Sequence, residues 1–425
     1  MTTEPDSLGL RSSATPVSDS ALRFLFLSAR LLLEYGVRSQ SLERRLERIA
    51  RHLGVNLTVV VGYRQVTLVL ADGRSLHASA PELRTNVAVS AGAQNVIDEL
   101  RQDQIDLGEA TKRLEGLERM APRHGRGVVI VLFGLAAAAI AWLLRADWAA
   151  IAVSGVSSSL GLIARQELAK RSVVLFAQPF VAGLIGAALG GFAIREGWTG
   201  TPGLCLIVPA LMLVPGPHLI NGVYDMLENH MQTGVCRLGL ATGLLIATAA
   251  GVALGAWMVL GPATISTAPS AVTPLTLPLD AALAGVAACG FGAFYNAPWR
   301  VLWVSILCGV VGHGLRYVCL DYMNVEIATL FGCLAVGAIA SVAAERRHLP
   351  FSALAFAGAV PMMPGVFIYQ SIAGAIRLSA ANTAVDPMLA STTLALSFKS
   401  TFVVGAIAVG LLIGARLASM SHRHG

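Results

Sequence analysis

The sequence predicts a mainly α-helical membrane protein in which ten transmembrane helices form a five-plus-five inverted repeat, preceded by a small α+β domain. Three observations predict this architecture. Hydrophobic residues make up 55% of the 425 residues and charged residues only 13%, against about 25% charged in soluble domains. The charges gather at the front: residues 1–127 hold 17 Lys/Arg and 15 Asp/Glu, and the other 298 hold 14 and 10. A Pro-Gly motif recurs within the apolar part.

The first 127 residues predict a tail and a soluble domain. Residues 1–18 are rich in Ser, Thr and Pro and are expected to be disordered, and their acidic residues argue against a secretory signal peptide. Residues 19–127 form the predicted cytoplasmic α+β domain. Its expected elements are helices over 20–35 and 41–53, strands over 55–61, 66–70 and 75–78, and a helical segment over 94–120.

This front domain shows no catalytic motif. His52 and His77 are isolated, and the sequence has no Gly-x-Ser-x-Gly, His-Glu-x-x-His or phosphate-binding loop. We therefore expect a scaffold or regulatory domain, no catalytic residues and no cofactor. The six cysteines lie scattered in apolar segments without a Cys-x-x-Cys pair, which favours reduced structural residues and no metal site. The lack of a continuous basic face argues against nucleic acid as a partner.

Ten nearly uncharged segments of the apolar part have the length of a transmembrane helix. They form a first half over 128–260 and a second half over 278–418, joined by an extracytoplasmic linker over 261–277, with residues 419–425 as a cytoplasmic tail. The predicted spans are 128–144, 148–164, 172–194, 203–223, 236–260, 278–296, 299–315, 323–343, 350–376 and 391–415.

Loop charges predict the orientation of these spans. With the front domain in the cytoplasm, eleven Lys/Arg flank the spans on the inside, and four lie outside: Arg145, Arg195, Arg316 and Arg377. Positive residues concentrate on the cytoplasmic side of membrane proteins. We therefore expect a multi-pass protein with both termini in the cytoplasm.

Two motifs predict an internal repeat. Leu213-Val-Pro-Gly216 in the fourth span and Met362-Met-Pro-Gly365 in the ninth lie 149 residues apart, and the same shift brings the other spans of the first half close to spans of the second. Because each half has an odd number of spans, the halves must enter the membrane from opposite sides. Secondary transporters use such inverted repeats for alternating access. Gly-x-x-x-Gly pairs, among them those beginning at Gly251 and Gly410, are expected to serve helix packing.

The Pro-Gly pairs predict two broken helices. Pro removes a backbone donor and Gly weakens a helix, so Pro215-Gly216 and Pro364-Gly365 should each end one half-helix and begin another. The N–H groups of His218 and Leu219 would then be unpaired at membrane depth and would favour a carboxylate as acceptor. We expect a substrate site where the two breaks meet.

Polar residues near the breaks extend the predicted site. Asn221 and Gln370 each follow a break glycine by five residues, and their amides could bind an ammonium or hydroxyl group. Tyr369, beside Gln370, is included in the site. The alternative is a pair of kinked helices whose amides only join neighbouring helices.

Two charged residues are candidates for ion coupling. Lys399 lies inside the tenth span, where it takes part in coupling or pairs with an anion, or else reaches toward an interface. Asp225 either carries a coupling proton or is a solvated charge at a helix end. Three single polar residues in the spans are more readily explained by hydrogen bonds between helices: Gln178, Asn296 and His313.

The motifs resemble the threonine/serine exporter family over roughly residues 25–415. The resemblance is carried by residues 33–54 (LEYGVRSQSLERRLERIARHLG), by 211–221 (LMLVPGPHLIN, with Asp225, Gly234 and Arg237 beyond it) and by 361–370 (PMMPGVFIYQ). It implies ten spans in the bacterial cytoplasmic membrane, a cytoplasmic front domain, and export of threonine and serine driven by the proton-motive force.

Three functions stay open. The first is a proton-coupled exporter of threonine or serine. The same architecture, split over two chains, resembles a bacterial succinate exporter, so a dicarboxylate is the second; Lys399 as the only lysine within a span favours the amino acid. The third is a membrane-anchored hydrolase with an active front domain. The expected partners are a small substrate, protons and the lipid bilayer, and the oligomeric state stays open.

Overall fold

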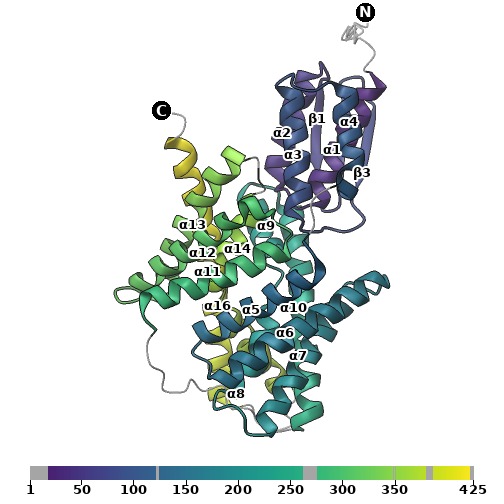
Figure 1. Ribbon diagram of the computed structural model, residues 1–425. Helices are drawn as coiled ribbons and strands as arrows, with labels where there is room; N and C mark the ends of the chain where they lie inside the picture. Colours follow the sequence, from purple (N-terminus) through teal and green to yellow (C-terminus); the bar gives the residue numbers. More distant parts are fainter. Residues whose placement is uncertain are drawn as a thin grey trace, which may run out of the picture.

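The computed structural model describes residues 18–120, 124–261, 275–347, 349, 351–379 and 386–421. Nearly all of the predicted N-terminal tail, most of the predicted linker and the last four residues lie outside this set. The front domain lies at one end of the molecule, and the remaining helices pack together below it (Figure 1).

The front domain is an α+β unit, as predicted. Its three strands form an antiparallel sheet in the order β1-β2-β3. Alternate residues of β2 (Val66, Leu68 and Leu70) are buried against the helices. The elements are α1 (Asp19–Glu34), α2 (Ser39–His52), β1 (Leu57–Val61), β2 (Gln65–Leu70), β3 (Ser75–Ser79), α3 (Val87–Arg101) and α4 (Leu107–Met120).

The predicted helical segment over 94–120 is in fact two helices, α3 and α4. The side chain of Asn86 caps α3 by accepting a hydrogen bond from the N–H of Val89 at 3.2 Å, so the helix begins earlier than expected. It ends at Arg101, and Asp103, with φ 55°, turns the chain before α4.

Eight helices within the described ranges are long and apolar enough to cross a membrane, and the number is ten if two bent helix pairs each count as one span. The eight are α5 (Arg126–Leu143), α6 (Trp148–Lys170), α7 (Ala177–Arg195), α10 (Met231–Leu260), α11 (Leu277–Phe294), α12 (Trp299–Cys319), α13 (Val325–Arg347) and α16 (Pro387–Ser421).

The two bent pairs occupy the fourth place in each group of five. The first pair is α8 (Pro202–Leu211) with α9 (Gly216–Leu227), bent by 62°. The second is α14 (Phe351–Ala359), continued by the 3-10 turn η1 (Val360–Met362), with α15 (Gly365–Ser379), bent by 69°. The predicted fourth and ninth spans, 203–223 and 350–376, are therefore both broken, as the two Pro-Gly pairs predicted.

The packing partners of the first group recur in the second. Helices α5 and α6, α6 and α7, α7 and α10, and α9 and α10 pack together, and so do α11 and α12, α12 and α13, α13 and α16, and α15 and α16. Contacts between the groups are reciprocal too, because α9 meets α14 while α8 meets α15. The two groups of helices therefore share one set of neighbouring pairs.

Small residues bring the most closely packed helices together, as predicted. A Cβ atom at Gly251 or Gly255 of α10 would overlap backbone atoms of α7, and one at Gly410 or Gly414 of α16 would overlap those of α13. Both Gly-x-x-x-Gly pairs therefore serve packing.

The end of α16 lies on the side of the front domain (Figure 1). Ala415 and Ser419 line a cavity of about 540 Å³ together with Arg38, Arg45 and Arg48 of the front domain.

Candidate functional site

The two helix breaks meet each other. A Cβ on Gly216, the first residue of α9, would overlap the ring of Phe356 in α14, and a Cβ on Gly365, the first residue of α15, would overlap the side chain of Leu211 in α8. The hydroxyl of Tyr369 in α15 donates to the carbonyl of Ala210 in α8 at 3.0 Å. The predicted breaks at 215 and 364 are therefore present, and each packs against the other pair.

The amide hydrogens at the first break are not free, contrary to our expectation. The N–H groups of His218 and Leu219 both donate to the carbonyl of Pro215, at 3.1 and 3.2 Å. Pro215 is the N-cap of α9, and its carbonyl accepts the first intrahelical bonds, as an N-cap carbonyl does.

The second break does leave donors available. The N–H of Ile368 donates to the carbonyl of Pro364 at 3.0 Å, but the structure gives no acceptor among the described residues for the N–H groups of Gly365, Val366 and Phe367. These three residues line a cavity. The positive end of the α15 dipole therefore lies at the wall of this cavity.

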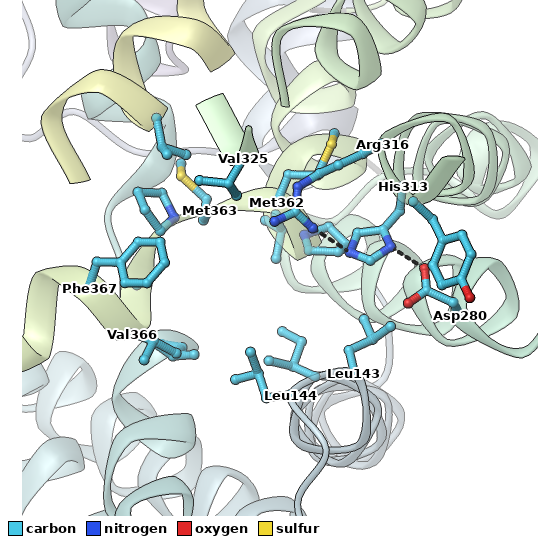
Figure 2. Close-up of a pocket in the computed structure, with 18 of the residues that line it drawn as sticks. Leu143, Leu144, Asp280, His313, Arg316, Val325, Met362, Met363, Val366 and Phe367 are labelled. Carbon is cyan, nitrogen blue, oxygen red and sulfur yellow. Dashed lines mark hydrogen bonds and ion pairs between the residues drawn. The ribbon is translucent and has the colours of Figure 1, made fainter. Parts of the chain in front are cut away.

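This cavity, of about 410 Å³, lies between the two groups of helices. Its walls come from the end of α5 and the break region of α8 in the first group, and from α11, α12, α14, η1 and α15 in the second (Figure 2). Most of the lining is apolar. Pockets of this size and character suit small molecules.

One end of the cavity is polar. His313 of α12 approaches Asp280 of α11 at 2.5 Å from Nδ1 to Oδ1, and the Nη1 of Arg316 lies 3.4 Å from His313 Nε2 (Figure 2). The Nε of Arg316 also donates to the hydroxyl of Thr329 at 3.0 Å. Arg145, at the end of α5, lines the same cavity. We call Asp280, His313 and Arg316 the polar triad.

Our sequence reasoning included none of the three members of this triad among the site residues. Asp280 is an acid inside an apolar span, and an ionisable residue there marks a functional site by default; that signal could have found it. Arg316 counted only as an outside loop charge. His313 does join two helices, as predicted, but it also faces the cavity.

Only Pro364 and Gly365 of the predicted substrate residues line this cavity. Tyr369 instead reaches α8. Lys399 of α16, a coupling candidate, is also absent from the described lining. Its Nζ lies 5.0 Å from the centroid of the ring of Phe367 in α15, which does line the cavity. The remaining predicted residues are absent from the described lining of the cavity: Pro215, Gly216, His218, Leu219, Asn221, Asp225 and Gln370.

Asn221 and Asp225 contact the front domain. The amide of Asn221 donates to the carbonyl of Gly36 at 3.2 Å. Asp225 is fully buried, accepts a hydrogen bond from the N–H of Ser39 at 3.3 Å and forms an ion pair with Arg237 at 2.7 Å. Asp225 is therefore neither solvated nor exposed to the cavity.

Residues Tyr35–Ser39, here called the docking turn, connect α1 to α2 and seat against both groups of helices. The hydroxyl of Ser352 in α14 donates to the carbonyl of Gly36 at 3.3 Å. Arg38 forms an ion pair with Glu228 at 3.5 Å. Gly36 has φ 78°, a left-handed conformation that favours glycine, and this conformation ends α1 and directs the chain into the turn.

Among the described residues of the front domain, a serine lies close to a histidine that no charged group contacts. The hydroxyl of Ser75 lies 3.2 Å from His77 Nε2 on the exposed face of β3. The other ring nitrogen contacts Thr67 and Gln65, which carry no charge to stabilise an imidazolium. The described residues contain no cluster of three or more His, Cys, Asp or Glu that could hold a metal.

Eight to ten apolar helices of membrane-spanning length, with a cavity between them, define a multi-pass membrane protein. Comparison with known families agrees: residues 23–259 match the model described as "putative threonine/serine exporter", and residues 280–416 match the one described as "threonine/serine exporter, ThrE". The chain belongs to the threonine/serine exporter family.

Curated relatives match a little over half of this chain. A probable succinate transporter subunit, YjjP, of Klebsiella aerogenes is 25% identical over 241 residues, which cover 56% of this chain and 93% of the relative. Its counterpart from Escherichia coli is 25% identical over 228 residues, 52% of this chain and 88% of the relative. No solved structure matches.

Proposed function

We propose that the chain is a proton-driven secondary exporter of small amino acids, threonine and serine, that works by alternating access between two inverted repeats. The observation that carries the proposal is the polar triad, which places a cation and an acid at one end of a small cavity between the two groups. A zwitterion needs both: Arg316 is suited to its carboxylate, and Asp280 to its ammonium.

The arrangement corresponds to an outward-facing state in this proposal. With the front domain in the cytoplasm of a bacterial cell, the ends of α5 and α12 that line the cavity lie toward the outside. On the cytoplasmic side, the docking turn fills the space between α9 and α14. Export would require the docking turn to separate from one of these helices, so that the cavity opens inward.

The reciprocal contacts support the inverted repeat. Gly216 packs on Phe356 as Gly365 packs on Leu211, and α9 meets α14 as α8 meets α15. Rocking of one group against the other about these contacts would alternate access, as in other transporters built from inverted repeats.

Counterflow tests the proposal. Proteoliposomes containing the full chain and loaded with unlabelled threonine should take up labelled threonine or serine, and the Arg316→Gln variant should lose at least about nine-tenths of this uptake, because one charge-assisted contact contributes ~1.5–3 kcal/mol. A suitable control is Arg195→Gln, since Arg195 lies at the end of α7 and does not line the cavity. Equal uptake by Arg316→Gln would contradict the proposed site.

A dicarboxylate is the second candidate. Two guanidinium groups, of Arg145 and Arg316, line the cavity, so the scarcity of lysine within the spans does not count against a dianion. The relatives named as probable succinate transporter subunits favour it as well. Succinate in place of threonine in the same counterflow assay separates the two substrates.

A further inference from the structure

The polar triad places an imidazole ring between an acid and a guanidinium. The Nδ1 of His313 lies 2.5 Å from Asp280 Oδ1, and its Nε2 lies 3.4 Å from the Nη1 of Arg316. An arginine side chain only donates hydrogen bonds, so a hydrogen bond from Arg316 uses the Nε2 lone pair and places the hydrogen of the ring on Nδ1, toward Asp280. A proton on Nε2 would take the place of that bond.

Other charged or titratable groups surround the triad on each element that packs against it. Tyr317 lies on α12, Asp321 follows the end of α12 and Arg145 follows the end of α5; all three line the cavity. On α13, Thr329 accepts from Arg316 and Cys333 lies near it. Asp280 and His313 are only 4% and 6% exposed, and both line the cavity.

We propose that Asp280 and His313 form the place where the driving proton and the substrate's ammonium group compete, while Arg316 holds the carboxylate. This inference rests on the proposed export of a zwitterion. When Arg316 turns to the carboxylate of the substrate, Asp280 accepts the ammonium group. A proton taken up on Nε2 makes His313 an imidazolium that neutralises Asp280 as an ion pair, so the ammonium group is expelled.

Competition gives the sign of coupling that an exporter needs. Each ligand lowers the affinity for the other by the same factor, so an inward-moving proton displaces an outward-moving amino acid. A dicarboxylate has no ammonium group, and a proton on His313 would add positive charge and strengthen its binding. The direction of the pH effect therefore separates the two substrates.

Only the second group carries this pair. The positions 149 residues before Asp280 and His313 are Val131 and Ala164, both unable to titrate. The inference therefore places proton coupling in one half of the repeat.

The test is threonine binding to the full chain in lipid nanodiscs from pH 8 to about pH 5.5, the range in which histidines titrate. We expect the affinity to fall on the order of tenfold on acidification. His313→Gln retains a carbonyl for Arg316 and an amide for Asp280 but does not titrate, so its affinity should stay constant with pH. The matched control His77→Gln, on the exposed face of β3, should behave as the unaltered protein.

A second measurement, on the unaltered protein, tests the inference even if His313→Gln fails to fold. Calorimetry of the unaltered protein in buffers of different ionisation enthalpy should show proton release when threonine binds at the acidic end. Absence of release, tighter binding in acid, or a pH dependence that persists in His313→Gln overturns the inference and leaves the exporter standing. If threonine is neither bound nor transported at any pH, the proposed function fails with it.

Discussion

Arg38 of the front domain lies over the ring of Tyr224 in α9, with 4.7 Å from its guanidinium carbon to the ring centroid. The same guanidinium lies 5.1 Å from the ring centroid of Phe351, at the start of α14. One side chain of the docking turn therefore contacts a bent pair in each group of helices.

Removing this side chain should loosen the docking turn. Cation–π contacts of a partly desolvated arginine contribute about 1–2 kcal/mol, so Arg38→Ala should speed hydrogen exchange at the amide of Ser39 on the order of tenfold. Hydrogen-exchange mass spectrometry of the full chain checks this. Arg74→Ala, which affects only the hairpin turn beside Asp72, is the control, and unchanged exchange in Arg38→Ala would refute the role of the docking turn.

The contact between the two breaks should not tolerate a methyl group. Gly365→Ala places a Cβ on the side chain of Leu211, and overpacking of this kind costs about 1–3 kcal/mol. We expect threonine counterflow to fall several-fold and the added Leu211→Ala to restore part of it. Gly405→Ala on α16 meets nothing within 4 Å and should behave normally. Failure of Leu211→Ala to restore counterflow would place the defect elsewhere.

The buried ion pair of Asp225 with Arg237 should be needed as a pair. Asp225→Asn leaves an uncompensated buried guanidinium, which costs about 3–5 kcal/mol, and should sharply lower the melting temperature and the yield of folded protein. The double variant Asp225→Asn with Arg237→Gln should recover much of this loss. The fraction of protein recovered by size-exclusion chromatography after heating gives the melting temperature of each variant. A double variant that melts no higher than the single one would contradict the pairing.

Glu34 should weaken the front domain at neutral pH. Burial and, next, the neighbouring Glu118 carboxylate raise the pKa of Glu34. The pKa of Glu34 is higher in the folded state than in the unfolded state. The stability contributed by its protonated carboxyl is therefore complete below the ordinary glutamate pKa and is lost as the pH rises through the raised value.

The variant Glu34→Gln should therefore raise the melting temperature at pH 7 by roughly 2–4 °C, with the gain vanishing near about pH 4. Scanning calorimetry of the full chain at both pH values measures the gain. Glu82→Gln, an exposed carboxylate also near Arg84, should change little. A gain of equal size at both pH values would show that the raised pKa is not its cause.

Local patterns predicted much of this fold. The apolar runs located the spans, and Pro215-Gly216 and Pro364-Gly365 located both breaks, because loss of a backbone donor acts on the chain where it occurs. The acceptor for the N–H groups of His218 and Leu219 is also local, since it is the carbonyl of Pro215. Whether this carbonyl points along α9 depends on the backbone dihedral angles of Pro215, which the sequence does not give.

Long-range pairings decided what the sequence could not show. Asn221 faces Gly36, 185 residues away, and therefore contacts the front domain and not the cavity. Asp280 and His313 lie on different helices, 33 residues apart, so periodicity within either helix says nothing of their contact. Only the packing of α11 on α12 brings them together.

The carbonyl oxygen of Gly36 accepts from Asn221 of one group and from Ser352 of the other. A single oxygen cannot follow two donors that move apart, so any widening between α9 and α14 must break one of these bonds. In any conformation in which α9 and α14 lie farther apart than here, the front domain therefore has to remain with one group and leave the other. The affinity of the front domain for each group therefore contributes to the equilibrium between inward-facing and outward-facing states. A substitution in this domain, which does not line the cavity, can thus alter the rate of transport across the membrane.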